Sequence, residues 1–302
     1  SAISCLDSWL HVVATTGTFT KSPEMTSLSI GPSGIPQGWT VVDYDMSEEP
    51  EDIPYVTFSA DTVQTMTVAL YGNYVLDSSL QYSVGGGEWI QLTAFTPISF
   101  GGAEGDLRLR GQSRSGLFIS TSDYAKITFG DNNVLVSASG DIRTLVDYKS
   151  YDTVSTATAR FGYMFSGCAS LTTAPELPAT ILADLCYGAM FAGCKALTTT
   201  PELPAKTLAE SCYMSMFSDC TNLTTAPELP ATTLAENCYN AMFYNCTGLV
   251  KASILPATTL AEGCYSYMFA LCTNLKSTPE LLTTTLAENC YNCMFMNCTG
   301  LV

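Results

Sequence analysis

Apolar side chains return every 26 residues through the C-terminal half of the chain. A Met-Phe pair recurs at this period, and a Cys follows each Met by four positions. The methionines of these pairs are Met164, Met190, Met216, Met242, Met268 and Met294. Self-similarity at a fixed period is the signature of repeat architectures, in which each copy buries its apolar side only against its neighbours. The pattern therefore predicts a stack of repeats over residues 147–302, with a cap from Gly140 to about Arg160.

Each repeat contains a segment whose apolar positions step by four. In one copy these positions are Leu234, Cys238, Met242 and Cys246, flanked by Ala235, Ala241 and Phe243. This spacing is typical of a short amphipathic helix. Thr233 stands where an N-cap is expected, with Glu236 three residues later, which matches a capping box. We therefore expect one short helix in each repeat.

The rest of the repeat alternates between two sides. In the same copy Leu223, Thr225, Pro227 and Leu229 alternate with Thr224, Ala226 and Glu228. This period of two is typical of an extended chain. Pro227 has no N–H group, so regular pairing should be limited to about the first three residues of each strand. The expected fold class is an α/β leucine-rich repeat solenoid, with a short strand plus a short helix per 26-residue repeat.

The N-terminal half has the pattern of an all-β protein. Residues 55–146 carry short alternating runs separated by turn residues, and Gly85, Gly86 and Gly87 between two runs indicate a hairpin. At least seven strands in about 90 residues favour an all-β sandwich domain, jelly-roll or immunoglobulin-like. Residues 1–54 are expected to form an N-terminal arm or extra strands, ending in an acidic linker from Asp43 to Asp52.

The repeat also resembles a known family. Residues 216–239, MFSDCTNLTTAPELPATTLAENCY, are similar to the BspA-like, or Treponema-type, leucine-rich repeats of bacterial surface proteins, over about residues 155–302. The resemblance implies a cell-surface or secreted protein, associated with adhesion in some members, and it implies no catalytic residues. Two stretches depart from the repeat, since residues 249–256 are LVKASILP and residues 275–282 are LKSTPELL.

Charge and hydropathy limit the partners. The chain carries 28 acidic and 12 basic residues, a net charge of −16. Such a surface would repel a nucleic-acid backbone or an anionic membrane. No apolar run approaches the roughly 18 residues of a membrane helix. We therefore expect no nucleic-acid partner and no membrane span in this chain, and a partner that is a host or bacterial surface protein or a glycan.

The thirteen cysteines allow either disulfides or a ladder of buried thiols. Two cysteines eight residues apart on a helix, such as Cys238 and Cys246, would be about 12 Å apart, too far for a disulfide. Equivalent cysteines on neighbouring helices would be about 8–10 Å apart, again too far. We therefore expect a thiol ladder. Only Cys290 and Cys293 have metal-ligand spacing, so we expect no metal site and no cofactor.

Candidate binding residues lie on the outward side of the alternating segments. They are Thr172, Glu176, Thr198, Glu202, Thr224, Glu228 and Glu280. The near-identical copies predict a stripe on a concave surface that binds a cation, a basic ligand or another repetitive ligand, and a merely solvated face is the alternative. The variable position before each Met, such as Tyr163 or Tyr267, is a second candidate surface. Trp89, after the glycine hairpin, is a possible sugar contact.

The residues do not favour an enzyme. His11 is the only histidine and lies among apolar neighbours, and the recurring glutamates form a ladder and not a unique catalytic pair. We expect a non-enzymatic protein for adhesion or ligand binding. The alternatives are a spacer and receptor-binding part of a larger fibre, or a carbohydrate-binding accessory module. Because the last repeat has no polar cap, we also expect self-association at the C-terminal repeat end or a longer natural chain.

Overall fold

The chain divides into two compact units, Ser1–Ile53 and Pro54–Val302. The computed structural model describes residues 16–21, 35–43, 54–154 and 157–302. In the first unit β1 (Thr18–Lys21) pairs in parallel with β2 (Thr40–Asp43). His11, Cys5 and residues 44–52 of the acidic linker lie outside the described residues. All candidate site residues named above belong to the second unit.

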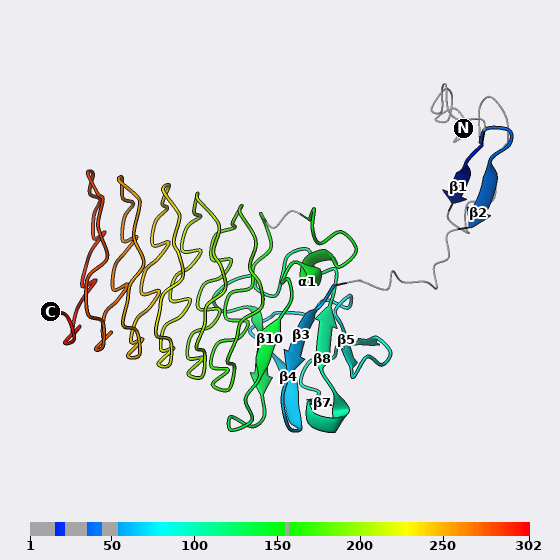
Figure 1. Cartoon of the computed structure of the whole chain (residues 1–302), viewed down its shortest axis with the longest axis horizontal. Helices are drawn as coiled ribbons and strands as arrows, with labels where there is room; N and C mark the ends of the chain where they lie inside the picture. The colour runs from blue at the N-terminus through cyan, green and yellow to red at the C-terminus, as the bar shows by residue number, and fades with distance from the viewer. Residues whose placement is uncertain (1–15, 22–34, 44–53, 155–156) are drawn as a thin grey trace. The chain divides into compact units, whose positions relative to one another are not determined.

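The second unit begins with two antiparallel sheets (Figure 1). Their strands are β3 (Val56–Ser59), β4 (Gln64–Tyr71), β5 (Gln81–Val84), β6 (Ile90–Gln91), β7 (Ile98–Phe100), β8 (Leu107–Arg110), β9 (Tyr124–Phe129) and β10 (Ser137–Ser139). One sheet has the order β10-β3-β8-β5-β6, and the other has the order β7-β4-β9. The short 3₁₀-helix η2 (Gly102–Glu104) follows β7.

Aromatic side chains fill the space between the two sheets. Phe58 of β3 lies 5.8 Å from Phe129 of β9, centroid to centroid, and Phe129 lies 6.1 Å from Phe100 of β7. All three are buried, because alternation along each strand turns every second residue inward. Phe58 also lies 5.9 Å from Phe165 of the first repeat, so the core of the sheets continues into the repeats.

The alternating pattern predicts strands in seven runs, and six of these runs contain a strand. The runs are residues 55–60, 64–70, 80–84, 88–95, 106–110, 116–120 and 125–129. Residues 116–120 contribute only two isolated bridges, from Gly116 to Arg160 and from Phe118 to Tyr124. The three-residue strands β7 and β10 lie outside the predicted runs. The glycine hairpin joins β5 to β6. Gly87 donates its N–H to the carbonyl oxygen of Val84, and Gly85 and Gly86 have φ angles of 59° and 77°. Two successive positive φ angles define a type I′ turn, which glycine adopts without strain.

The repeats contain no helix. About 3% of the described residues are helical and 22% lie in strands or isolated bridges. Among them α1 (Thr144–Asp147), which precedes the repeats, is the one α-helix. The expected α/β leucine-rich repeat solenoid, with a helix in each repeat, is therefore wrong. Each expected helix is instead a run of overlapping tight turns, which we call a turn segment. The turn segments are residues 161–168, 183–194, 209–220, 235–246, 261–272 and 287–298.

The turn segment 209–220 shows why no helix forms. Every second N–H group, such as that of Met216, donates to the carbonyl oxygen three residues earlier, here that of Tyr213. Ser211, Ser215 and Asp219 have φ angles between 51° and 60°. A positive φ at the third residue of a turn is characteristic of type II. Type II turns therefore alternate with turns that have no positive φ at that residue. The backbone therefore repeats every four residues, which reproduces the apolar step of four that suggested a helix.

The remaining N–H groups of a turn segment bond to the next repeat. Phe217 donates its N–H to the carbonyl oxygen of Met242 at 2.9 Å, and Tyr213 donates to that of Cys238 at 3.0 Å. Thr233, expected as an N-cap, lies just before a turn segment and donates its N–H to the carbonyl oxygen of Lys206 in the preceding repeat. The hydrogen bonds that would lie within a helix therefore join neighbouring repeats.

The alternating segments are extended, as expected, but they form only isolated bridges. These extended segments are residues 171–178, 197–204, 223–230, 249–256 and 275–282. Lys251 makes parallel bridges with Thr225 on one side and Ser277 on the other. Pro227 and Pro230 interrupt further pairing, because proline has no N–H to donate. The expected short strand in each repeat is thus reduced to single bridged residues.

Identical side chains stack from repeat to repeat in the interior. One ladder consists of Phe165, Phe191, Phe217, Phe243, Phe269 and Phe295, with ring centroids 5.5–5.8 Å apart and nearly parallel planes. A second ladder runs from Tyr187 through Tyr213, Tyr239 and Tyr265 to Tyr291 at 5.7–6.0 Å. Neighbouring repeats are therefore much closer than the 8–10 Å that separates packed helices.

The sheets cover the N-terminal end of the repeat stack. Ile127 of β9 donates its N–H to the carbonyl oxygen of Met164 at 2.7 Å, and Val136 donates to that of Ser170 at 3.0 Å. The expected cap takes part through Ile142, which donates its N–H to the backbone carbonyl oxygen of Glu176. Most of the cover, however, comes from β9 and the loop after it. Sheets and repeats consequently form one continuous unit.

Candidate ligand-binding site

Two neighbouring recesses form a groove across the extended segments. One, of about 560 Å³, lies between segments 223–230 and 249–256, and the other, of about 390 Å³, lies between segments 197–204 and 223–230. Glu228 and Pro230 line both recesses, so they join across three successive repeats. Their volumes are within the range of pockets that bind small ligands. We call residues 200–204, 225–230 and 251–256 the groove.

The floor of the groove is apolar and its edge is charged. Pro201 and Leu203 are buried beneath the smaller recess, and Leu229 is buried beneath the larger one. Glu202 and Glu228 are exposed above them. This division follows from the period-two backbone, which sends alternate side chains inward and outward. A ligand in the groove would therefore contact apolar surface and carboxylates together.

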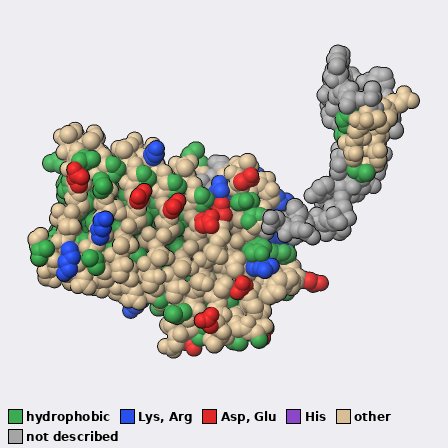
Figure 2. Space-filling view, in the orientation of Figure 1, with side chains coloured by type: hydrophobic (Ala, Val, Ile, Leu, Met, Phe, Trp, Pro, Cys, Tyr) green, Lys and Arg blue, Asp and Glu red, His purple; other side chains and the backbone are tan. Residues whose placement is uncertain are grey.

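The expected stripe lies on the same side of the repeats as the groove. Glu176, Glu202, Glu228, Glu280, Thr198 and Thr224 are exposed, and Thr172 is partly buried. Thr172 donates its hydroxyl hydrogen to the carbonyl oxygen of Val136 at 3.0 Å. Figure 2 shows acidic side chains in a row across the repeat stack. Of the seven stripe residues, Glu202 and Glu228 line the groove, and ligand binding by any of them stays a prediction.

Segment 249–256 lies outside the candidate residues that the sequence predicts. Lys251, Ser253 and Ile254 line the larger recess at the positions that Thr225, Pro227 and Glu228 occupy one repeat earlier. Ile254 keeps 60% of its surface exposed. Ser253 donates its hydroxyl hydrogen to the carbonyl oxygen of Pro227. The departure from the repeat was visible in the sequence, but its position in the groove depends on how the repeats stack.

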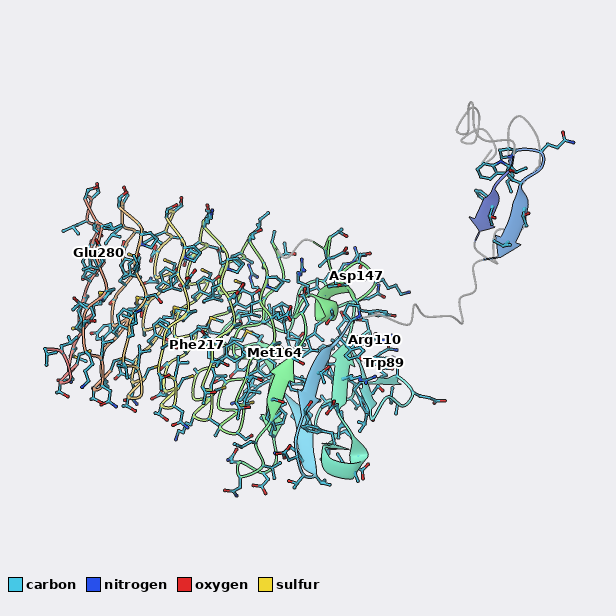
Figure 3. The ribbon with its side chains drawn as sticks, viewed as in Figure 1. Trp89, Arg110, Asp147, Met164, Phe217 and Glu280 are labelled. Atoms are coloured by element: carbon cyan, nitrogen blue, oxygen red, sulfur yellow. The ribbon has the colours of Figure 1, made fainter. Side chains whose placement is uncertain are left out.

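Trp89 does not present a free ring face on the side of β8. The guanidinium of Arg110 lies 4.0 Å from the centroid of the Trp89 ring and 4.4 Å from that of Tyr148 (Figure 3). Tyr55 lies 5.8 Å from Trp89 in a tilted arrangement. Arg110 is buried, and the contact with Trp89 is a cation–π interaction. A sugar stacked on Trp89 would have to displace this arrangement or use the opposite side of the ring.

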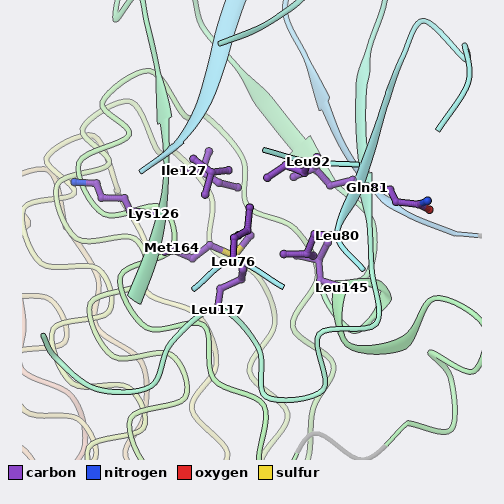
Figure 4. Close-up of a pocket in the computed structure, with 12 residues that line it drawn as sticks. Leu76, Leu80, Gln81, Leu92, Leu117, Lys126, Ile127, Leu145 and Met164 are labelled. Carbon is purple, nitrogen blue, oxygen red and sulfur yellow. The ribbon is translucent and has the colours of Figure 1, made fainter. Parts of the chain in front are cut away.

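A closed cavity lies between the sheets and the first repeat (Figure 4). Leu80, Leu92, Leu117, Ile127 and Met164 contribute to its apolar lining. Its volume is about 20 Å³, which is room for about one water molecule. The cavity is therefore a packing defect of the core and not a ligand site.

The second candidate surface is not uniformly exposed. The positions before each Met in the turn segments, such as Tyr163 and Ala189, are among those with positive φ. Ala189 is buried, and Tyr163 stacks on Tyr124 of β9 with centroids 4.8 Å apart. Residues at these positions therefore form part of the turns, and Tyr163 also packs against the sheets, so the positions do not form a continuous exposed surface.

The twelve described cysteines are free thiols, and Cys293 is the exposed one among them. Burial raises the pKa of Cys168, Cys186 and Cys220 to about 12 each. Thiols with such pKa values stay protonated at neutral pH and are poor nucleophiles and metal ligands. Within the described part of the chain, no group of three His, Cys, Asp or Glu side chains could hold a metal ion.

No helix of the described residues is long and apolar enough to cross a membrane. Comparisons of the chain with protein-family models, curated proteins and solved structures find no match.

Proposed function

We propose that this protein is a non-enzymatic binding protein of the cell surface, which attaches to a host or bacterial partner through the extended segments of its repeats. The observation that carries the proposal is the groove, because it crosses three repeats on the side where the outward residues recur. The resemblance of the repeats to BspA-like bacterial surface proteins supports the location and the adhesive role.

The chemistry of the groove suits binding without catalysis. Glu202 and Glu228 occupy equivalent positions in successive repeats and therefore have similar surroundings. General acid and base catalysis needs two groups whose surroundings push their pKa values apart. Equivalent carboxylates instead suit contact with successive groups of an extended ligand, where several weak contacts add up.

A pair of matched variants tests the proposal. The double variant Glu202→Gln/Glu228→Gln removes two carboxylates from the groove, and Glu210→Gln/Glu262→Gln removes two exposed carboxylates from the turn segments. Both change the net charge equally. The 302-residue chain and both variants are tested by surface plasmon resonance against immobilised matrix proteins, mucins and glycans. We expect a ligand whose affinity falls at least about tenfold in the groove variant only. Equal affinity in the two variants would contradict the proposal.

A further inference from the structure

The repeated face is uniform except at one place. Glu176, Glu202, Glu228 and Glu280 are equivalent residues, so a ligand bound to a uniform row could move by one repeat and meet the same groups again. Ile254 occupies the fourth of these five positions and interrupts the row. The interruption gives the face a fixed reference point, because only one placement of a ligand puts an apolar group over Ile254.

The interruption lies in the larger recess of the groove. Ile254 follows Glu228 by one repeat and exposes 60% of its surface there. Lys251 lines the same recess, and its bridge with Thr225 fixes its backbone beside the neighbouring segment. The groove therefore has two unlike ends, with Glu202 at the acidic end and Lys251 with Ile254 at the other.

We propose that this groove binds an extended polypeptide segment, with basic side chains over Glu202 and Glu228 and an apolar side chain over Ile254. The inference rests on the proposed function and names the ligand class and the placement of the ligand. Lys251 repels a basic side chain at the apolar end, so it also fixes the direction in which the segment lies. The carboxylates attract the two basic side chains by charge complementarity, and the lysine disfavours the reversed placement.

The lining favours a polypeptide over a glycan. The groove residues are Thr, Pro, Glu, Leu, Ala, Lys, Ser and Ile, with no aromatic and no amide side chain among them. The apolar floor matches aliphatic side chains, whereas sugars stack on aromatic rings. A glycan ligand is therefore a competing outcome for the experiment to detect.

The spacing of the repeats sets the sequence pattern of the ligand. Ring centroids of the Phe ladder in these repeats are 5.5–5.7 Å apart, and an extended peptide advances about 6.6 Å for every two residues. Side chains at positions i, i+2 and i+4 can therefore face three successive repeats, with a mismatch of about 2 Å accumulated over the groove. The expected motif is basic-x-basic-x-apolar.

Synthetic peptides test the motif against the 302-residue chain. Fluorescence anisotropy compares nine-residue labelled peptides that contain Lys-x-Lys-x-Leu, Lys-x-Lys-x-Lys or Glu-x-Glu-x-Leu, with x as Ser or Thr. We expect the Lys-x-Lys-x-Leu peptide to bind about tenfold more tightly than the Lys-x-Lys-x-Lys peptide and the acidic peptide to show no binding. Its affinity should fall as salt rises from 50 to about 500 mM, because the contacts are partly exposed.

A double variant then reverses the preference. Lys251→Thr/Ile254→Glu restores the residues that the neighbouring repeat carries at these positions, and both side chains are exposed, so the fold is retained. In this variant three carboxylates stand in a row, and Lys-x-Lys-x-Lys should become the preferred peptide. Glu210→Gln/Glu262→Gln serves as the control and should keep the original order.

The outcomes separate this inference from the function on which it rests. A reversed preference in the double variant supports both. If no peptide binds but a glycan binds and is lost in Glu202→Gln/Glu228→Gln, the proposed function stands and the polypeptide inference is overturned. If the peptides bind with the same order of affinities in Lys251→Thr/Ile254→Glu as in the unmodified protein, the inference is also overturned. Absence of binding by peptides, matrix proteins and glycans alike overturns the inference and the proposed function together.

Discussion

Cys194 donates its thiol hydrogen to the carbonyl oxygen of Phe165 in the preceding repeat, with 3.2 Å between sulfur and oxygen. The same contact recurs from Cys220 to Phe191 and from Cys246 to Phe217. Disulfides between repeats are excluded if equivalent cysteines lie on helices about 8–10 Å apart, but the repeats are closer than that. The geometric reason was therefore wrong. The thiols are instead held by hydrogen bonds to backbone carbonyl groups of the neighbouring repeat.

Thiol labelling should distinguish Cys293 from the buried cysteines. In a Cys5→Ser background, which removes the one cysteine outside the described residues, the native protein should show one rapidly reacting thiol. Cys293→Ser should abolish that reaction, and the other thiols should react only after local unfolding, orders of magnitude more slowly. A chromogenic thiol reagent followed in a spectrophotometer measures the rates. Several rapidly reacting thiols in the native protein would contradict the buried ladder.

Alkaline pH should destabilise the repeats. Burial raises the pKa of Cys220 to about 12 and that of Cys264 to about 11, from a value of 9.0 in the unfolded chain. Above pH 9 the unfolded thiols lose protons that the folded protein retains, so the free energy of unfolding is unaffected below pH 9 and decreases as the pH rises through 9–11. Each such thiol contributes about 1.4 kcal/mol per pH unit in this window.

Urea denaturation at pH 7.5 and pH 10 measures this effect. Cys264→Ala should lose about 1.4 kcal/mol less than the unmodified protein on transfer to pH 10, since it has one titrating thiol fewer. A midpoint that does not change between these pH values, or an equal loss in the variant, would argue against deprotonation of buried thiols.

Phenylalanines in the middle of the Phe ladder should contribute more to the free energy of unfolding than the one at its end. Phe217 is fully buried between Phe191 and Phe243, whereas Phe295 stacks only on Phe269 among the described rings and is partly exposed. Phe217→Ala should cost about 3–5 kcal/mol, and Phe295→Ala clearly less. Chemical denaturation of both variants gives the comparison. Equal losses would mean that the rings do not act as a stacked row.

Glycine substitution should change the stability in opposite directions in a turn with positive φ and in a helix. Ala241 has a φ of 53°, a conformation that costs an L-residue about 1–2 kcal/mol and costs glycine nothing. Ala241→Gly should therefore stabilise the protein by up to about 1 kcal/mol, whereas in a helix it would destabilise by a similar amount. Ala235→Gly, at a position without positive φ, is the matched control and should destabilise. Thermal unfolding reports both, and a lower midpoint for Ala241→Gly would contradict the turn geometry.

The 26-residue period and the buried positions could be predicted from the sequence, but the backbone could not. Cys212, Met216 and Cys220 are buried whether a segment is helical or built from four-residue turns, because both bring every fourth residue to one side. The distinguishing signal was elsewhere in the repeat. Gly193, Asp219 and Asn245 share one position and all have positive φ. Gly, Asp and Asn tolerate that conformation best, and their recurrence within an apparent helix indicates turns.

The groove was predictable only in part. The alternation in segment 223–230 predicts that Glu228 faces outward. The sequence also shows that Lys251 and Ile254 differ from the residues at the equivalent positions one repeat earlier. Their common location depends on the close spacing of the repeats, which follows from the hydrogen bonds between turn segments. Trp89 was selected from its local sequence, and no local pattern reveals that Arg110, about 20 residues later in the chain, covers its ring.

The hydrogen bonds between turn segments all point the same way. From Tyr213 to Cys238 and from Phe217 to Met242, the earlier repeat supplies the amide and the later repeat supplies the carbonyl. Each turn segment thus presents amide donors to the following repeat and carbonyl acceptors to the preceding one. Removing or duplicating one whole 26-residue unit preserves this polarity at the new junction, whereas an insertion of any other length places unmatched groups in contact. The length of the array can therefore change in whole units without redesign of the neighbours.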